Sequence, residues 1–344
     1  MFRRRGGRPR PLRDQVIVIT GASSGIGRAT ADLAASRGAA VVLAARDIDA
    51  LELAAGAIRS RGGRALAVEC DVSRPDQIEA LAMRAIEHYA GLDTWVNNAG
   101  LSVYGRLDEV PIEDQRAVFD VNFWGLVSGS LTAARAMARD GGVIINVGSV
   151  ASDRAVPLQG AYSASKHAVK AFTDTLRMEL DEAGLPIAVS LVKPASIDTP
   201  FFEHARTYMD GDPRPVPPVY AAGEVARVIV RCAERPVRDV AVGAASRALA
   251  VSSAVAPRLT DLYMEKTMFA GQQRAPRPRP QTGNLEVPQP PHRETGDYGG
   301  HVMQTSAYTR AVTSNAMRFV PVVAAGVALA LASRPRPVDV ARTR

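Results

Sequence analysis

The chain has 344 residues, of which 47% are hydrophobic and 22% are charged, a balance typical of a soluble globular protein with one large domain or two smaller ones. The net charge of +7 is concentrated at the two ends: residues 1–15 carry +5 and residues 272–344 carry +6, which leaves −4 for residues 16–271. This distribution argues against a folded nucleic-acid-binding face and a specific nucleic-acid partner, although the arginine-rich ends could touch anionic lipid or RNA loosely.

Residues 1–14 are predicted to form a basic, flexible N-terminus. The apolar stretch that follows, "VIVIT" (16–20), is too short for the hydrophobic region of a secretory signal. The two cysteines, Cys70 and Cys232, lie far apart and lack metal-like spacing. We therefore expect both to be small core residues of a cytoplasmic protein, with no metal site.

Short segments rich in Val and Ile alternate with segments of helical spacing from residue 15 onward. The former lack strict polar alternation, which is typical of strands buried on both faces of a parallel sheet. The pattern predicts an α/β fold: one Rossmann-like, doubly wound domain over 15–271, with a mostly parallel seven-stranded sheet and helices on both faces. The expected strands are 15–20, 40–44, 65–70, 92–97, 142–148, 187–192 and 239–243, and the expected helices are 26–37, 49–61, 75–90, 112–139, 160–183 and 223–234.

A glycine-rich loop, "TGASSGIG" (20–27), joins the first strand to the first helix. Its glycines, Gly21, Gly25 and Gly27, have the spacing G-x-x-x-G-x-G rather than that of the commonest dinucleotide fingerprint. Glycine lets the backbone approach a ligand closely, and the helix N-terminus beyond it suits a pyrophosphate. Ser23 and Ser24 add hydroxyl donors. A tight turn without a ligand is the alternative, but the strand–turn–helix context favours nucleotide binding.

The second strand ends at Ala45–Arg46, nineteen residues after Gly27. In Rossmann folds this position contacts the adenosine ribose, and an acid there binds the 2′-hydroxyl of NAD. Arg46 could instead pair with a phosphate through two parallel hydrogen bonds, so the sequence favours NADP over NAD. A shift of one residue would place Asp47 at the ribose and favour NAD, and Arg46 could also be an exposed charge at a helix start.

The stretch "YSASK" places Tyr162 and Lys166 four residues apart on one face of a predicted helix. A free tyrosine hydroxyl has a pKa near ~10, and a nearby ammonium group lowers it, which would let the phenol exchange a proton with an alcohol or carbonyl. Ser149 ends the fifth strand, at the edge of the sheet where ligands bind. Each residue alone is common in such positions; together with the glycine loop they indicate hydride-transfer chemistry.

Several further motifs follow one another along the chain, and their order and spacing are informative. Besides the glycine loop, Ser149 and "YSASK", they are "CDV" (70–72), "NNAG" (97–100), Asn122 in "VNFWG", and "KPASIDT" (193–199). Over about residues 16–250 the sequence therefore resembles the short-chain dehydrogenases/reductases.

The resemblance implies roles for four catalytic residues. Tyr162 would be the general acid/base, and Lys166 would lower its pKa and hold the nicotinamide ribose hydroxyls. Ser149 would orient and polarise the substrate carbonyl. Asn122 would anchor a water that joins Lys166 to bulk solvent, completing a proton relay.

The resemblance also implies contacts to the dinucleotide. Asp71 and Val72 would flank the adenine, whereas Ile197 and Thr199 would contact the nicotinamide carboxamide and a nearby phosphate. Asn98, Ala99 and Gly100 would support the adenosine ribose and the central sheet. The full set of expected cofactor-binding residues is Gly21, Ser23, Ser24, Gly25, Ile26, Gly27, Arg46, Asp71, Val72, Asn98, Ala99, Gly100, Tyr162, Lys166, Pro194, Ile197 and Thr199.

One position departs from the family pattern. Relatives usually have Pro-Gly after the sixth strand, where this chain has Pro194–Ala195. Alanine tolerates fewer backbone angles than glycine, so the loop on the nicotinamide side could have a different backbone conformation from that of relatives. The change touches no catalytic group.

The family pattern does not cover the C-terminal extension. Residues 272–318 are predicted to be a Pro/Arg-rich disordered linker, because so few apolar residues cannot repay the entropy of ordering. Residues 319–332 predict a short apolar helix of roughly 21 Å, less than the ~30 Å hydrocarbon core of a membrane. It could dock on the domain or a partner subunit, or associate with a membrane. Residues 333–344 form a basic tail.

The sequence as a whole predicts an NAD(P)-dependent oxidoreductase, NADP preferred, that acts on a carbonyl or a secondary alcohol. The family places its specificity loop at 200–220, where Phe201, Phe202, Tyr208 and Met209 could form an apolar lid over a lipophilic substrate, or pack into the domain. The alternatives are a non-catalytic binding protein, a membrane- or protein-docking scaffold, and an epimerase or dehydratase. Because helices 112–139 and 160–183 pair subunits in many relatives, we expect a homodimer or homotetramer.

Overall fold

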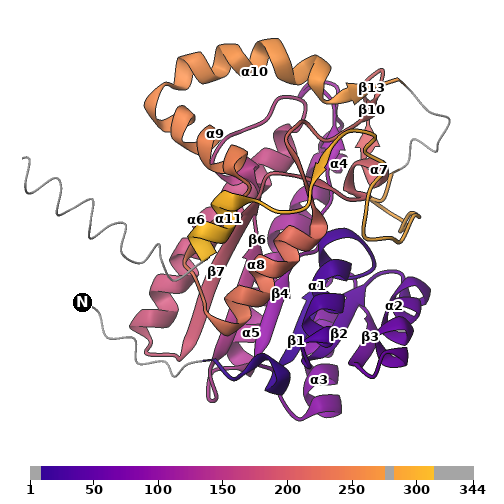
Figure 1. Cartoon of the computed structure of the whole chain (residues 1–344), viewed down its shortest axis with the longest axis vertical. Coiled ribbons are helices and arrows are strands. Elements are labelled where there is room, and N and C mark those ends of the chain that lie inside the picture. Colours follow the sequence, from indigo (N-terminus) through magenta and orange to yellow (C-terminus); the bar gives the residue numbers. More distant parts are fainter. Residues whose placement is uncertain (1–8, 276–282, 314–344) are drawn as a thin grey trace, which may run out of the picture.

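The structure is a computed structural model that describes residues 9–275 and 283–313. Within these residues a parallel sheet of seven strands has the order β12-β7-β6-β4-β1-β2-β3 (Figure 1), which confirms the predicted doubly wound α/β fold. The strands are β1 (Val16–Thr20), β2 (Ala40–Ala45), β3 (Arg64–Glu69), β4 (Thr94–Asn97), β6 (Gly142–Val147), β7 (Ile187–Pro194) and β12 (Asp239–Val242).

Helices cover both faces of the sheet, because successive strand residues point to opposite sides. In β1, Ile17 and Ile19 join one core cluster, whereas Val16 and Val18 join the other. The first cluster is covered by α1 (Gly25–Ser36), α2 (Ile48–Ser60) and α8 (Ala222–Glu234), and the second by α3 (Pro75–Tyr89), α5 (Leu126–Ala136) and α6 (Gly160–Glu182).

The strand order reverses at β1, which pairs with β2 on one side and β4 on the other. The chain proceeds outward through β2 and β3, then returns to β4 and proceeds through β6, β7 and β12. In open parallel sheets a ligand crevice forms at the carboxyl ends of the strands where the order reverses. The glycine loop after β1 and the "NNAG" motif at the end of β4 lie at this point.

The helix expected over 112–139 is not continuous. It consists of α4 (Ile112–Phe119), a π-helical turn at Asp120–Gly125 and α5. A Cβ on Gly125 would lie 2.8 Å from the backbone oxygen of Val72, so the turn packs directly against the "CDV" segment. Single π-turns inside α-helices are frequent at functional sites, and this one carries Asn122.

Further elements lie above the carboxyl edge of the sheet. Helices α9 (Ala244–Val255) and α10 (Pro257–Gly271), which the sequence pattern did not single out, form a hairpin there (Figure 1). The 3-10 turn η1 (Leu12–Asp14) instead precedes β1, at the amino edge. The other short elements are β5 (Val103–Tyr104), η3 (Val150–Ser152), β8 (Ser196–Asp198), α7 (Phe201–His204), β9 (Arg206–Thr207), β10 (Asp212–Pro213), β11 (Val219–Ala221), β13 (Gln273–Arg274), β14 (Val302–Met303) and α11 (Ala307–Thr313).

The prediction of a disordered linker over 272–318 is wrong for residues 283–313, which fold back onto the domain. β14 pairs in parallel with β11, and α11 follows, with Thr309 accepting a hydrogen bond from Gly243 N at 2.9 Å. Hydrogen bonds and ion pairs to domain loops order this segment. The prediction considered only its low apolar content and therefore missed these polar contacts. The predicted apolar helix at 319–332 and the tail at 333–344 lie outside the described residues.

Among the described residues, none of the helices is both long enough and apolar enough to cross a membrane.

Candidate active site

The glycine loop is held to the end of β4 by one side chain, that of Asn98. Its amide nitrogen donates to the backbone oxygens of Thr20 (2.9 Å) and Gly21 (3.2 Å), and Thr20 Oγ1 accepts from Asn98 N and Ala99 N. A Cβ on Gly27 would lie 2.2 Å from Gly21 O. Residue 27 must therefore be glycine, and the loop is closed as tightly as a backbone allows.

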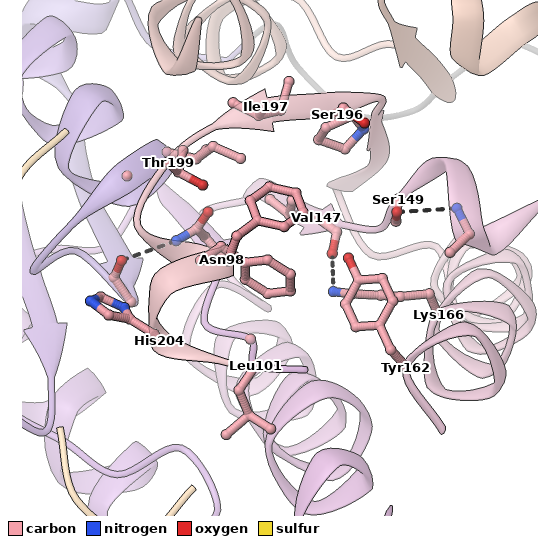
Figure 2. Close-up of a pocket in the computed structure, with 18 of the residues that line it drawn as sticks. Asn98, Leu101, Val147, Ser149, Tyr162, Lys166, Ser196, Ile197, Thr199 and His204 are labelled. Carbon is pink, nitrogen blue, oxygen red and sulfur yellow. Dashed lines mark hydrogen bonds between the residues drawn. The ribbon is translucent and has the colours of Figure 1, made fainter. Parts of the chain in front are cut away.

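Tyr162 and Lys166 project from the first turns of α6 toward the end of β6 (Figure 2). Lys166 Nζ donates to Val147 O at 2.9 Å and lies 5.8 Å from the centre of the Tyr162 ring. Ser149 follows β6 directly and its hydroxyl accepts from Ala151 N at 3.1 Å. The backbone thus brings the phenol, the ammonium group and the hydroxyl to one wall of the crevice, as the spacing predicts.

The direction of the Tyr162 pKa corrects one expectation. Burial raises this pKa above its ordinary value of 10, and the hydrogen bond with the Ser149 hydroxyl acts against the rise. Burial also lowers the pKa of Lys166 from 10.5 to about 8. Both shifts have the same cause, because removal from water disfavours phenolate and ammonium alike.

Asn122 lies behind this wall rather than on it. Its side-chain oxygen accepts from Leu101 N (2.8 Å), and its amide donates to Leu101 O (2.9 Å) and Ser165 Oγ (3.2 Å). A Cβ on Gly100 would lie 3.2 Å from Asn122 Oδ1 and 3.8 Å from Lys166 Nζ. The side chain of Asn122 therefore fixes the backbone at Gly100 and Leu101, which lies close to Lys166.

At the end of the crevice where we expect the adenosine, the residues after β2 and β3 meet. Arg46 follows β2, and Asp47 is the N-cap of α2, accepting from Ala50 N at 2.9 Å. Asp71 accepts from Ser73 N and Ser73 Oγ, which fixes the turn after β3. Arg46 and Asp47 both line the crevice.

At the opposite end, the segment after β7 closes the site. Pro194, Ile197 and Thr199 all line it, and a Cβ on Gly25 would lie 3.1 Å from Thr199 Cβ. Ala195 takes the place of the usual glycine without disturbing the sheet, since its N–H bonds to Val242 O at 3.0 Å. The departure from the family pattern at this position is therefore tolerated.

These residues surround a cavity of about 350 Å³, within the range of small-molecule sites. Of the catalytic and cofactor-binding residues predicted from sequence, all but Gly27 and Asn122 line it. Phe201 and Phe202 line it as well, whereas Tyr208 and Met209 do not; Tyr208 turns away and donates to Asp114 Oδ2 at 2.7 Å.

Sequence reasoning missed two groups of lining residues. One comes from the hairpin of α9 and α10, and the other from the C-terminal segment that was expected to be disordered. Helical periodicity could have found the hairpin, but no sequence signal places the C-terminal segment here. The missed residues include Leu249, Met264 and Met268 in the first group and Asn284, Pro288, Gln289 and His292 in the second; Tyr104 from β5 is one of several others.

The cavity fits a dinucleotide. Gly21 has a φ of 66°, which is favourable for glycine, and the loop leads into α1, whose first N–H groups lack intrahelical partners. The N–H of Gly25 donates to Arg293 O at 2.9 Å. The glycines leave no side chain between the helix start and the cavity, so a pyrophosphate could contact the N–H groups that follow. The adjoining walls carry Arg46 at one end and Tyr162 and Lys166 toward the other.

Comparisons with known proteins agree with this geometry. The family model described as short chain dehydrogenase matches residues 15–210. The "Uncharacterized oxidoreductase YxnA" of Bacillus subtilis is 40% identical over 330 residues, covering 94% of this chain and 92% of the relative. The chain belongs to the short-chain dehydrogenase/reductase family.

Solved structures give the same assignment. A short-chain dehydrogenase/reductase from Burkholderia phymatum in complex with NAD has a TM-score of 0.63 and 30% identity, covering 81% of this chain and all of that one. An alcohol dehydrogenase from Thermococcus sibiricus complexed with 5-hydroxy-NADP has a TM-score of 0.59 and 27% identity, covering 66% and 95%. The protein is thus an oxidoreductase of a family whose members bind NAD or NADP.

Proposed function

We propose that the protein interconverts a carbonyl and a secondary alcohol with a nicotinamide dinucleotide, with Tyr162, Lys166 and Ser149 handling the proton. The observation that carries this proposal is the convergence of these three side chains at the end of β6, in the same cavity as the glycine loop. A dinucleotide bound there supplies or accepts the hydride.

Tyr162 donates its proton to the substrate oxygen in the reductive direction. Its raised pKa keeps the phenol protonated at neutral pH, the state that a proton donor needs. Ser149 donates to the same oxygen and orients it. Lys166, with a pKa of about 8, is mostly cationic at pH 7, and its charge favours the phenolate left after proton transfer.

The substrate side of the cavity supports a lipophilic ketone or alcohol. Phe201 contacts the ring of Tyr162, with 5.6 Å between centroids, and Phe202 lies next to it. Apolar residues of the α9–α10 hairpin continue this wall at Leu249, Met264 and Met268. Arg214 is also present, but its Nε–H bonds to Gly271 O.

The experiment that tests this function is a turnover screen of ketones, aldehydes and secondary alcohols with NADPH, NADH and their oxidised forms. We expect reduction of apolar ketones and no turnover of small anionic ones. A protein that binds a dinucleotide but turns over none of these compounds, while altering a sugar or hydroxyl stereocentre, would instead be an epimerase of the same fold.

For the cofactor we propose a preference for NADP. Arg46 places a guanidinium group on the cavity wall, where it also donates to backbone oxygens of residues 284–286. Asp47 accepts from Ala50 N and pairs with His292 at 2.9 Å. A guanidinium paired with a phosphate forms charge-assisted hydrogen bonds that NAD cannot make.

Replacing Arg46 with alanine should therefore raise the Kd of NADPH about tenfold more than that of NADH, since a hydrogen bond to a charged group is worth about 1.5–3 kcal/mol. Equilibrium titration of the bound reduced cofactor by fluorescence measures both values. Arg46 also bonds to backbone oxygens of residues 284–286. If its loss only loosened that segment, the binding of NADPH and NADH would weaken equally. Equal losses would contradict the NADP preference.

Exposed apolar side chains support an oligomer formed through α5 and α6. Trp124, Leu131 and Met178 expose large apolar side chains on these helices or on the π-turn beside them. We propose that a second copy covers them in a dimer or tetramer, which sedimentation measurements would reveal.

A further inference from the structure

The C-terminal extension forms a strap, residues 284–300, over the mouth of the nucleotide cavity. In Figure 1 it is part of the orange-to-yellow segment that runs from the side of α7 to α11. It contacts the residues after β2, the start of α1, and the loop after β7, which are the segments expected to bind the adenosine, the pyrophosphate and the nicotinamide. It therefore spans the cavity from end to end.

At the adenosine end, Arg46 is bonded to the strap backbone. Its guanidinium group donates to the carbonyl oxygens of Asn284, Leu285 (2.8 Å) and Glu286 (3.2 Å). Leu285 itself is 8% exposed and joins a core cluster between β5 and α4. These contacts give the strap both a polar and an apolar anchor beside the expected adenine site.

In the middle of the strap, Arg293 O accepts from Gly25 N at 2.9 Å, so the strap backbone contacts the glycine loop directly. His292 pairs with Asp47 nearby. Two buried polar atoms on the strap, Asn284 Oδ1 and His292 Nδ1, have no hydrogen-bond partner among the described residues. Both residues line the cavity, and buried polar atoms without partners are unusual and costly.

At its far end the strap is fixed to the nicotinamide side. Arg274 makes two hydrogen bonds of 2.8 Å to Asp297. Gly296 packs so closely that a Cβ there would lie 2.7 Å from both Asp198 Oδ1 and Thr199 O. Thr199 lines the cavity, and its backbone oxygen cannot move without moving the loop after β7.

The strap places no acid on the cavity wall, so it does not repel an anionic ligand there by direct contact. Its cavity-lining residues, Asn284, Pro288, Gln289 and His292, include no acid. Its three acids do not line the cavity, and two of them form ion pairs: Glu286 with Arg206 and Asp297 with Arg274. A strap that excluded the dinucleotide would have to fill its site, yet the cavity that the strap residues line together with the glycine loop and Tyr162 keeps a volume of about 350 Å³.

We propose that the strap is the outer wall of the dinucleotide site and that the cofactor can leave only when the strap detaches. This inference rests on the proposed function, because it requires that a nicotinamide dinucleotide occupies the cavity. Asn284 and His292 would offer their unpartnered polar atoms to the bound nucleotide. Slow opening of such a lid commonly limits ligand release.

The test compares two glycine variants of the full-length chain. Gly296→Ala places a methyl group against Thr199 O and Asp198 and should push the strap away, whereas Gly299→Ala is a matched control because a Cβ there meets nothing within 4 Å. Neither position has a backbone angle that excludes alanine. Each protein is loaded with NADPH, and release is followed by fluorescence after an excess of NADP⁺ is added.

We expect Gly296→Ala to release NADPH about tenfold faster than the wild type and Gly299→Ala. Leu285→Ala, which removes the apolar anchor at the other end, should also accelerate release. Thermal unfolding checks that each variant is folded.

Equal release rates in all four proteins, or tighter NADPH binding by Gly296→Ala, would overturn the proposal, the second because it would mean that the strap excludes the cofactor. Failure of the wild type to bind any nicotinamide dinucleotide would instead overturn the proposed function, and this inference with it.

Discussion

Replacing Tyr162 with phenylalanine is expected to lower kcat for ketone reduction about 10³-fold, within the 10²–10⁴-fold range that a positioned general acid contributes. The change removes one oxygen and keeps the ring, which packs against Phe201, so the wall of the cavity stays in place. The Kd of the dinucleotide should change by no more than about twofold, because the phenol contributes to the chemical step rather than to the glycine-loop contacts. Stopped-flow turnover and a fluorescence titration measure the two quantities.

Tyr104→Phe is the matched control. Tyr104 also lines the cavity, and its buried hydroxyl has no hydrogen-bond partner among the described residues, so removal of that oxygen leaves no partner unsatisfied. We expect a much smaller loss of turnover than for Tyr162→Phe, because the proton donor is still present. Retention of a tenth of the wild-type rate by Tyr162→Phe would exclude Tyr162 as the proton donor.

The sheet and the catalytic wall could be predicted from the sequence because their signals are local. Buried strands appear as Val/Ile-rich runs, and the spacing of Tyr162 and Lys166 places both on one helix face whatever the rest of the chain does. The glycine loop could be predicted for the same reason, because its three glycines lie within seven residues of one another. These features depend on periodicity and backbone geometry within a few residues.

The strap could not be predicted, because its order comes from long-range polar contacts. Arg46 bonds to residues nearly 240 positions away, and Gly25 bonds to Arg293. The composition of residues 272–318, with few apolar residues, indicates disorder. Composition alone does not reveal that backbone carbonyl oxygens of this segment accept hydrogen bonds from a distant guanidinium group. The direction of the Tyr162 pKa was missed for a related reason, since helical spacing gives the proximity of Lys166 but not the extent of burial.

Lys166→Met is expected to lower kcat for ketone reduction about 10²-fold, comparable to the loss of one preorganised polar group in an active site. Methionine keeps most of the volume but removes the charge that stabilises the phenolate left on Tyr162 after proton transfer. The variant should still fold, although Val147 O loses the donor that Lys166 provides at 2.9 Å, and thermal unfolding would report that loss.

The pH dependence separates this role of Lys166 from a purely structural one. Because burial lowers the pKa of Lys166 to about 8, its ammonium form is present below that pH and is lost as the pH rises through it. The wild-type kcat for reduction should therefore fall as the pH rises through about 8, and Lys166→Met should lack this fall. Lys170→Met, one turn further along α6 where Lys170 pairs with Asp153, should keep both the rate and the fall. A wild-type pH profile shared by Lys166→Met would show that the amine at position 166 only supports the fold, and that the proton leaves Tyr162 without help from its charge.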